Sequence, residues 1–261
     1  MRKPYKEFYA RLSEEYNEEE FVYSTASGRL RREYITQLLK KHFNSDQPDY
    51  ILDVGCGGMP VQLNNYQIIG IDIGLASLCR ARQNNTDSIF ICGDADNLDF
   101  LKACSFGYAV LSETIEHLEE PQKCLKGIFN ALKPGGMLLI TCPNWNRRKP
   151  IMELPSQIRR LPVPLPEPEG YLHTAYKPEE LKQMCQQAGF KTVEMGSFEK
   201  ELRYWTKIPQ IGYRAAQKIF GNRTWVDKLY HSSLKLGVAL LAVTLSLIHI
   251  SEPTRPLYIS Y

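Results

Sequence analysis

At 261 residues, the chain is long enough to bury one large α/β core with a small appendage. Hydrophobic residues make up 43% of the sequence and charged residues 23%, which excludes a mainly disordered protein. The formal net charge of +3 is too small to indicate a nucleic-acid-binding protein by itself. The seven cysteines contain no CxxC pair and are scattered through apolar segments. We therefore expect reduced core thiols and a cytoplasmic protein rather than disulfides or a zinc site.

Two segments decide what is expected about membranes. Arg2 and Lys3 are basic, but no apolar run follows them, so we expect no secretory signal. The most apolar run, 236–250, is shorter than the roughly 20 residues that a membrane-spanning helix needs. We therefore expect no transmembrane segment.

Two helices are expected before the first strand, at 4–16 and 28–43, because apolar residues recur there at helical spacing. These helices could cap a pocket, and simple packing against a sheet explains them equally well. The expected strands lie at 50–54, 67–72, 88–92, 108–111, 137–142 and 191–198, and further helices at 74–82, 121–132 and 177–188. Strands that alternate with helices predict an α/β fold with a doubly wound, mostly parallel sheet, whose ligands bind at the carboxyl ends of the strands.

A glycine-rich turn follows the first expected strand. Residues 50–60 read Y-I-L-D-V-G-C-G-G-M-P, an apolar run with an acid near its end and then three glycines. Glycines let backbone amides approach a ligand closely, so this pattern is typical of a turn that binds a phosphate or a nucleoside. The pattern alone is a weak signal, because glycine-rich turns also close ordinary loops.

Acids stand at the ends of the next two expected strands. Asp72 ends the second strand, where a carboxylate can accept both hydroxyl groups of a ribose. Asp94 follows the third strand in the run Gly93-Asp94-Ala95. These acids and the glycine turn are predicted to meet at one edge of the sheet.

Six motifs in order carry a family resemblance. They are D-V-G-C-G (53–57), G-I-D (70–72), G-D-A (93–95), E-T-I-E-H-L (113–118), L-K-P-G-G (132–136) and A-G-F (188–190). Together they resemble the class I S-adenosylmethionine-dependent methyltransferases over about residues 50–198, and most closely the branch that includes the ubiquinone-biosynthesis O-methyltransferases. The resemblance implies a seven-stranded Rossmann-like sheet with an antiparallel last strand, which we expect at 236–244.

The resemblance also implies a set of cofactor-binding residues for S-adenosyl-L-methionine. By its motifs, the methionine moiety is bound by Asp53, Gly55 and Gly57, the ribose by Asp72, the adenine by Asp94 and the Ala95 amide, and Ser112 lies beside the methionine and the sulfonium. Two departures are present. Met59-Pro60 replaces a further glycine after Gly57, which puts the shape of the turn in doubt, and Gly107 replaces a common, mostly structural acid.

A nicotinamide-dependent oxidoreductase is the competing interpretation, because it too uses a glycine turn and an acid after the second strand. Against it, the Asp53 carboxylate comes two residues before the first glycine, where it would repel a pyrophosphate. A cofactor with a sulfonium and an ammonium group meets no such repulsion.

A second constellation is formed by Glu113, Glu116 and His117, with His173 later in the chain. If the segment is helical, positions i, i+3 and i+4 share a face, and His173 would complete a set of two oxygen and two nitrogen ligands. Methyltransferases with a similar E-x-x-E-H pattern bind a divalent cation such as Mg²⁺ there, which would lower the pKa of a substrate hydroxyl. The alternatives are solvated or helix-capping glutamates with a packed histidine, or catalysis without metal in which His117 or His173 is the general base.

The segment 143–178 contains eight of the 16 prolines, which excludes a central strand or a long helix. Because it follows a strand at the expected pocket, we predict a substrate lid. Its basic residues are Arg147, Arg148, Lys149, Arg159 and Arg160, and Trp145 and Tyr171 add aromatic surface. An anionic substrate such as a phosphorylated lipid, a nucleotide-sugar or RNA would suit it, and a solvated surface is the simpler explanation for any single arginine.

The expected organisation has five parts: an N-terminal helical cap (1–47), a cofactor-binding core (48–143), the lid (144–177), the remainder of the core with a helical insertion (178–245), and a tail (246–261). The tail reads S-L-I-H-I-S-E-P-T-R-P-L-Y-I-S-Y and resembles translated sequencing-adapter read-through, so we expect it to be non-native. The expected function is methyl transfer from S-adenosylmethionine to a hydroxyl of a small molecule, lipid or glycan. The alternatives are an RNA or protein methyltransferase and a non-catalytic cofactor-binding regulatory subunit.

Overall fold

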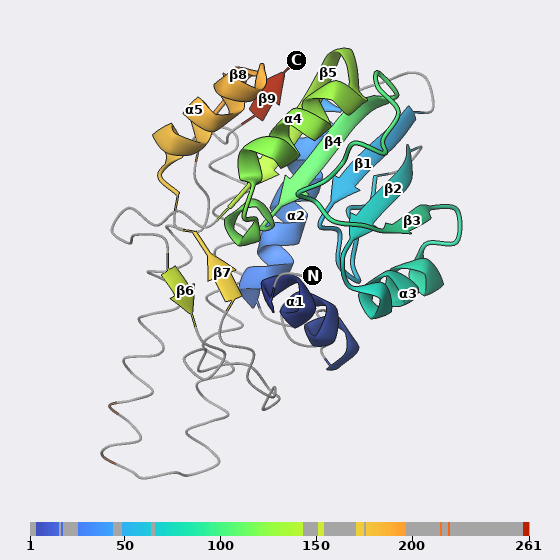
Figure 1. Ribbon diagram of the computed structural model, residues 1–261, viewed down its shortest axis with the longest axis vertical. Helices are drawn as coiled ribbons and strands as arrows, with labels where there is room; N and C mark the ends of the chain where they lie inside the picture. Colours follow the sequence, from blue (N-terminus) through green and yellow to red (C-terminus); the bar gives the residue numbers. More distant parts are fainter. Residues whose placement is uncertain are drawn as a thin grey trace.

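The computed structural model describes residues 4–15, 17, 26–43, 49–63, 66–142, 151–153, 171–174, 176–196, 215, 219 and 258–260. Its centre is a run of parallel strands in the spatial order β3-β2-β1-β4-β5 (Figure 1). These strands are β1 (Asp49–Val54), β2 (Tyr66–Asp72), β3 (Ile89–Cys92), β4 (Phe106–Ser112) and β5 (Leu132–Thr141). The order reverses between β1 and β4, and open α/β sheets bind ligands at such a switch point, at the carboxyl ends of the strands.

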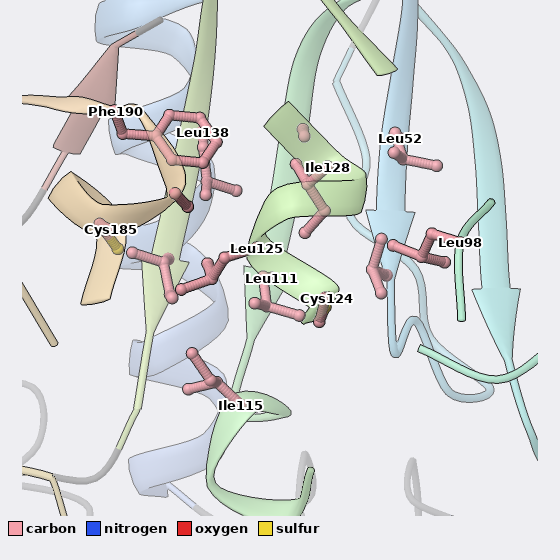
Figure 2. Packing of buried hydrophobic residues seen from close by; sticks show 14 of the residues in the cluster. Leu52, Leu98, Leu111, Ile115, Cys124, Leu125, Ile128, Leu138, Cys185 and Phe190 are labelled. Carbon is pink, nitrogen blue, oxygen red and sulfur yellow. The ribbon is translucent and has the colours of Figure 1, made fainter. Parts of the chain in front are cut away.

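Helices cover both faces of this sheet, as a doubly wound fold requires. The helix α2 (Ala26–His42) packs Ile35, Leu38 and Leu39 onto one face, where the inward strand residues include Ile51 and Val110. The helices α4 (Pro121–Ala131) and α5 (Pro178–Ala188) cover the other face. Figure 2 shows the second cluster, with side chains from β1, β4 and β5 meeting those of the two helices; its labelled members are Leu52, Leu98, Leu111, Ile115, Cys124, Leu125, Ile128, Leu138, Cys185 and Phe190. The predicted α/β fold with a doubly wound, mostly parallel sheet is therefore confirmed.

The alternation of side chains explains how one strand serves two clusters. Ile51 lies with α2, and Leu52, one residue later, lies with α4 and α5. Leu138 and Leu139 divide between the clusters in the same way. Successive residues of a strand point to opposite faces, so a strand buried on both sides is apolar throughout.

The fifth strand begins earlier than expected. The sequence predicts a strand from residue 137, but β5 starts at Leu132, directly after α4 ends at Ala131. Leu132 pairs with Phe106, and the register shifts before Met137 pairs with Tyr108. The intervening Gly135 has φ +80°, so the Pro-Gly-Gly segment interrupts the strand instead of separating it from the helix.

The far edge of the sheet departs from the prediction. Beyond β5, the sheet continues through β9 (Tyr258–Ser260) to β8 (Lys191–Glu194), and both pairings are antiparallel. The last strand expected at 236–244 lies outside the described residues and is not confirmed. The segment that pairs with β5 belongs instead to the 246–261 tail.

Four further elements lie near the carboxyl ends of the parallel strands. The helix α1 (Pro4–Glu15) lies below those ends and beside α3 (Leu75–Asn84) in Figure 1. A 3₁₀ turn, η2 (Ile115–His117), follows β4. The strands β6 (Ile151–Glu153) and β7 (Tyr171–His173) form a separate antiparallel pair. Apart from these two strands and residues 174, 176 and 177, the predicted lid lies outside the described residues.

Within the described part of the chain, no helix combines the length and apolar character needed to cross a membrane.

Candidate functional site

The turn after β1 requires glycine at two positions. Gly55 has φ +72° and Gly57 has φ +55°, in the left-handed region that favours glycine. The Gly55 amide donates to the Ile71 carbonyl at 2.7 Å, which joins the turn to the end of β2. A Cβ atom added at Gly55 would lie 2.2 Å from Thr114 Oγ1, so backbone and neighbouring side chain are in direct contact there. The turn is thus closely packed from both sides.

Asp53 lies beneath this turn. Its side chain is 3% exposed, and its Oδ2 accepts the Val61 amide at 2.8 Å. Burial raises the pKa of Asp53 to about 7. The Asp53 side chain thereby connects the end of β1 to Val61, the residue that follows Met59-Pro60. This contact shows how the turn accommodates Met59-Pro60 in place of a further glycine.

Asp72 is held by two backbone amides from different turns. Gly57 donates to its Oδ2 at 2.9 Å, and Gly74 donates to its Oδ1 at 2.7 Å. Burial raises the pKa of Asp72, against these hydrogen bonds, which favour the ionised form. The carboxylate therefore connects the glycine turn to the start of α3, at the carboxyl end of β2.

Asp94 and Asp96 follow β3 and share one cation. The Lys6 ammonium pairs with Asp94 Oδ2 and lies 3.5 Å from Asp96 Oδ2. Asp94 Oδ1 accepts the Asp96 amide at 3.0 Å. Asp96 is 3% exposed, and its Oδ1 accepts the Glu120 amide at 3.1 Å. Lys6 belongs to α1, so the N-terminal helix is paired to the loop after β3.

The same helix contacts two other parts of the site. The Tyr9 hydroxyl lies 2.7 Å from His117 Nδ1, at the end of η2. One turn further along, the Ser13 carbonyl accepts Arg80 Nη2 at 2.8 Å. A Cβ atom at Gly74 would lie 2.5 Å from Ser13 Cβ, so α1 packs directly on the start of α3. The helix α1 therefore spans the carboxyl edge of the sheet from β3 to β4.

Glu113 occupies a strained position at the end of β4. Its φ of +51° is unusual for a residue with a side chain. Arg31 Nη1 of α2 lies 2.8 Å from its Oε2, and Thr141 Oγ1 donates to its Oε1 at 3.1 Å. Thr141 Oγ1 also lies 2.9 Å from Ser112 Oγ. A cation and a hydroxyl group thus fix the Glu113 carboxylate between β4, β5 and α2.

Glu116 is buried in η2 with an incomplete set of partners. It is 2% exposed, its Oε1 lies 3.8 Å from His117 Nε2, and its Oε2 accepts no hydrogen bond from the described residues. Burial, followed by the nearby Glu113 charge, raises its pKa well above the usual range. The Glu116 carbonyl accepts the Thr174 amide at 2.7 Å, which brings the end of β7, where His173 lies, beside the 3₁₀ turn.

Comparison with known proteins identifies the family. A family model described as a methyltransferase domain matches residues 26–195, which is more than half of the chain. The chain belongs to this family. The resemblance to class I S-adenosylmethionine-dependent methyltransferases is therefore confirmed.

Several curated relatives share one name. A ubiquinone biosynthesis O-methyltransferase of Rickettsia felis is 26% identical over 127 residues, which cover 46% of this chain and 51% of the relative. The protein of the same name from Chromobacterium violaceum is 27% identical over 150 residues, which cover 53% and 63%. The chain spans about half the length of the curated relatives it matches.

Solved structures support the methyltransferase fold. The PH0226 protein of Pyrococcus horikoshii has a TM-score of 0.54 and 18% identity, covering 73% of this chain and 93% of that one. The [4+2]-cyclase SpnF has a TM-score of 0.52 and 19% identity, covering 87% and 78%. At these identities the likeness concerns the fold alone, and the cyclase shows that this fold is not tied to one reaction.

The predicted metal site of the methyltransferase is not supported. The interpretation required helical spacing from Glu113 to His117, but only residues 115–117 form a helical turn, and Glu113 precedes it. Glu113 is held by Arg31, and His117 is held by Tyr9. Among the described residues, no group of three or more histidine, cysteine, aspartate or glutamate side chains could hold a metal ion. The described side chains therefore give no support for a divalent cation, and the side chain of His173, the fourth predicted ligand, lies outside the description.

The structure adds three residues that the sequence motifs did not single out in the methyltransferase. Lys6, Tyr9 and Arg31 come from α1 and α2 and contact Asp94, His117 and Glu113. The spacing of Lys6 and Tyr9 by three places them on one helix face, which was the available signal. Their partners lie 88 and 108 residues away in the sequence, and no local pattern predicts such pairs.

Proposed function

We propose that the protein transfers a methyl group from S-adenosyl-L-methionine to a hydroxyl oxygen of a small molecule, lipid or glycan. One observation carries the proposal. The ends of β1, β2 and β3 bring together a glycine turn, Asp72 and Asp94 at the edge where the strand order reverses. Family membership supports the same cofactor. We also propose that the protein is cytoplasmic.

The residues present fit the cofactor in three places. Gly57 carries no side chain and has positive φ, so a ligand could approach its backbone, whereas the Cβ position of Gly55 is filled by Thr114. Asp72 and Asp94 offer carboxylates for the ribose hydroxyls and the adenine amino group, with the Ala95 amide and Ser112 completing the set. An acid after the second strand would serve a dinucleotide as well, so the choice of cofactor rests on the family match.

The acceptor side would be organised by His117. When bound, the cofactor supplies an electrophilic methyl group. In the proposed reaction the acceptor oxygen forms a bond to the methyl carbon, the carbon–sulfur bond breaks with its electrons on sulfur, and the hydroxyl proton passes to His117 Nε2. If Nδ1–H donates to the Tyr9 oxygen, Nε2 is the ring nitrogen that can accept this proton. Glu113 and the β7 segment that carries His173 would border the acceptor pocket rather than hold a metal.

Oxygen as the acceptor atom rests on the relatives named as ubiquinone biosynthesis O-methyltransferases. The predicted preference for an anionic substrate rests on basic residues outside the described part of the chain. The alternatives are an RNA or protein acceptor, and cofactor binding without methyl transfer. They are therefore tested by a transfer assay, separately from the cofactor-binding assay.

The test has a binding arm and a transfer arm. Isothermal titration is expected to show binding of S-adenosylhomocysteine and none of NADH. Binding of NADH alone would refute the proposal. Incubation with tritiated S-adenosylmethionine and fractionated extract should then label a small molecule, lipid or glycan. Label in RNA or protein would change the acceptor class, and binding without any label would favour the regulatory role. A chelator is expected to leave transfer unchanged, because the described residues form no metal site.

A further inference from the structure

The ion pair between Lys6 and Asp94 lies where the proposed cofactor would place its adenine. The Lys6 side chain is 14% exposed and that of Asp94 is 33% exposed, so the pair is partly buried but reachable from solvent. Asp94 Oδ1 already accepts the Asp96 amide. Oδ2, the oxygen that Lys6 contacts, is therefore the one suited to a further donor.

The position of Lys6 is set by the rest of α1. Tyr9 holds the helix at His117, and Ser13 holds it at Arg80 and Gly74. Lys6 and Tyr9 lie on one face, so the helix that delivers the ammonium to Asp94 also contacts the acceptor end of the site. The contacts of α1 thus fix the Lys6 ammonium at the site, so its pairing with Asp94 is not a chance contact of a surface lysine.

We propose that Lys6 is an internal competitor of the cofactor: its ammonium occupies Asp94 Oδ2 until the adenine 6-amino group replaces it, and Lys6 then pairs with Asp96. This inference rests on the proposed function. Both donors approach the one Asp94 oxygen that does not accept the Asp96 amide, so they compete for it. Asp96 Oδ2 is 3.5 Å from the ammonium, so the lysine keeps a buried carboxylate partner after the exchange.

The exchange gives the direction of a mutational effect. Cofactor binding breaks the Lys6–Asp94 pair but keeps the Lys6–Asp96 pair, so only the first opposes binding. Lys6→Met removes this opposition and leaves Asp94 open to the amino group. For a charge-assisted pair that is partly exposed, we expect the dissociation constant of S-adenosylhomocysteine to fall by about threefold to tenfold. Lys6→Arg keeps a cation of similar reach and should stay within about twofold of the wild type.

An analogue without the amino group separates competition from helix docking. S-inosylhomocysteine carries a carbonyl oxygen at the purine 6-position, which accepts a hydrogen bond from Lys6 and is repelled by Asp94. Lys6→Met should therefore tighten binding of S-adenosylhomocysteine and weaken binding of S-inosylhomocysteine. Titration calorimetry of both ligands with the full chain and both variants measures this reversal.

Each outcome decides the inference. Opposite shifts for the two ligands support direct competition, as does binding of S-adenosylhomocysteine by Lys6→Met alone. Equal shifts in one direction overturn the inference, because they mean that Lys6 acts only through the docking of α1 or through overall charge. If the wild type binds S-adenosylhomocysteine and Lys6→Met binds it no better, the inference fails while the proposed function stands. If neither protein binds it, the proposed function fails as well.

Discussion

Replacing Asp53 with asparagine tests the cost of a buried carboxylate beneath the glycine turn. The folded protein raises the pKa of Asp53 from 3.8 to about 7, chiefly through burial. Between these values the folded state holds a proton that the unfolded state has lost, so the free energy of unfolding falls as the pH rises. At about 1.4 kcal/mol per pH unit, the full loss is about 4 kcal/mol above pH 7. An asparagine side chain would keep an oxygen for the Val61 amide but could not ionise.

The measurement is urea unfolding at several pH values between 4 and 8. We expect the wild type to lose stability toward pH 8, and Asp53→Asn to gain relative to it by up to about 4 kcal/mol at the alkaline end. Burial also raises the pKa of Asp72 and Glu116, so the difference between the two proteins, not the wild-type slope, isolates Asp53. Asp87→Asn, at an exposed acid, is the control for replacing a carboxylate with an amide elsewhere in the chain. Parallel slopes for wild type and Asp53→Asn would refute the argument.

Three further predictions follow from the turn, the acceptor side and the tail. Gly55→Ala should lower the free energy of unfolding by about 2 to 4 kcal/mol and abolish cofactor binding, because its φ is +72° and Thr114 leaves no space for a Cβ. Gly135→Ala, with φ +80° but open surroundings, should cost only about 1 kcal/mol in the same urea unfolding assay. His117→Ala should slow methyl transfer by about 100-fold to 10,000-fold at unchanged S-adenosylhomocysteine affinity; an unchanged rate would remove it as the base. Deleting 246–261 removes β9, which pairs with β5 and β8, so the unfolding midpoint should drop; an unchanged midpoint would support a non-native tail.

The parts of the fold that depend on local periodicity could be predicted from the sequence. The apolar runs before Asp53 and Asp72 are buried on both faces, so each shows an unbroken apolar stretch that ends in an acid. Parallel strands then bring these acids to one edge without any further information. The start of β5 was wrong because Pro-Gly-Gly normally ends a helix and starts a loop, whereas pairing of Leu132 with Phe106 extends the strand across it.

The contacts of the site could not be predicted for a different reason. The conformation of Glu113 depends on Arg31 and Thr141, which approach from separate elements. The local sequence of residues 113–117 is compatible with a helix. The positive φ of Glu113 is not a helical conformation, so no helix includes this residue. The metal interpretation depended on that helix, so it has no support from the described residues.

The boundary of the family match separates two kinds of residue in the site. The match begins at residue 26, where α2 starts, so it includes Arg31 and every acid at the strand ends but excludes α1. Asp53 and Asp72 are held by amides from the matched region. Asp94 and His117 are instead contacted by Lys6 and Tyr9, which lie outside it. The residues of α1 that contact the site thus lie outside the matched region, and variants of Lys6 should change cofactor affinity without disturbing the turn that Gly55 forms.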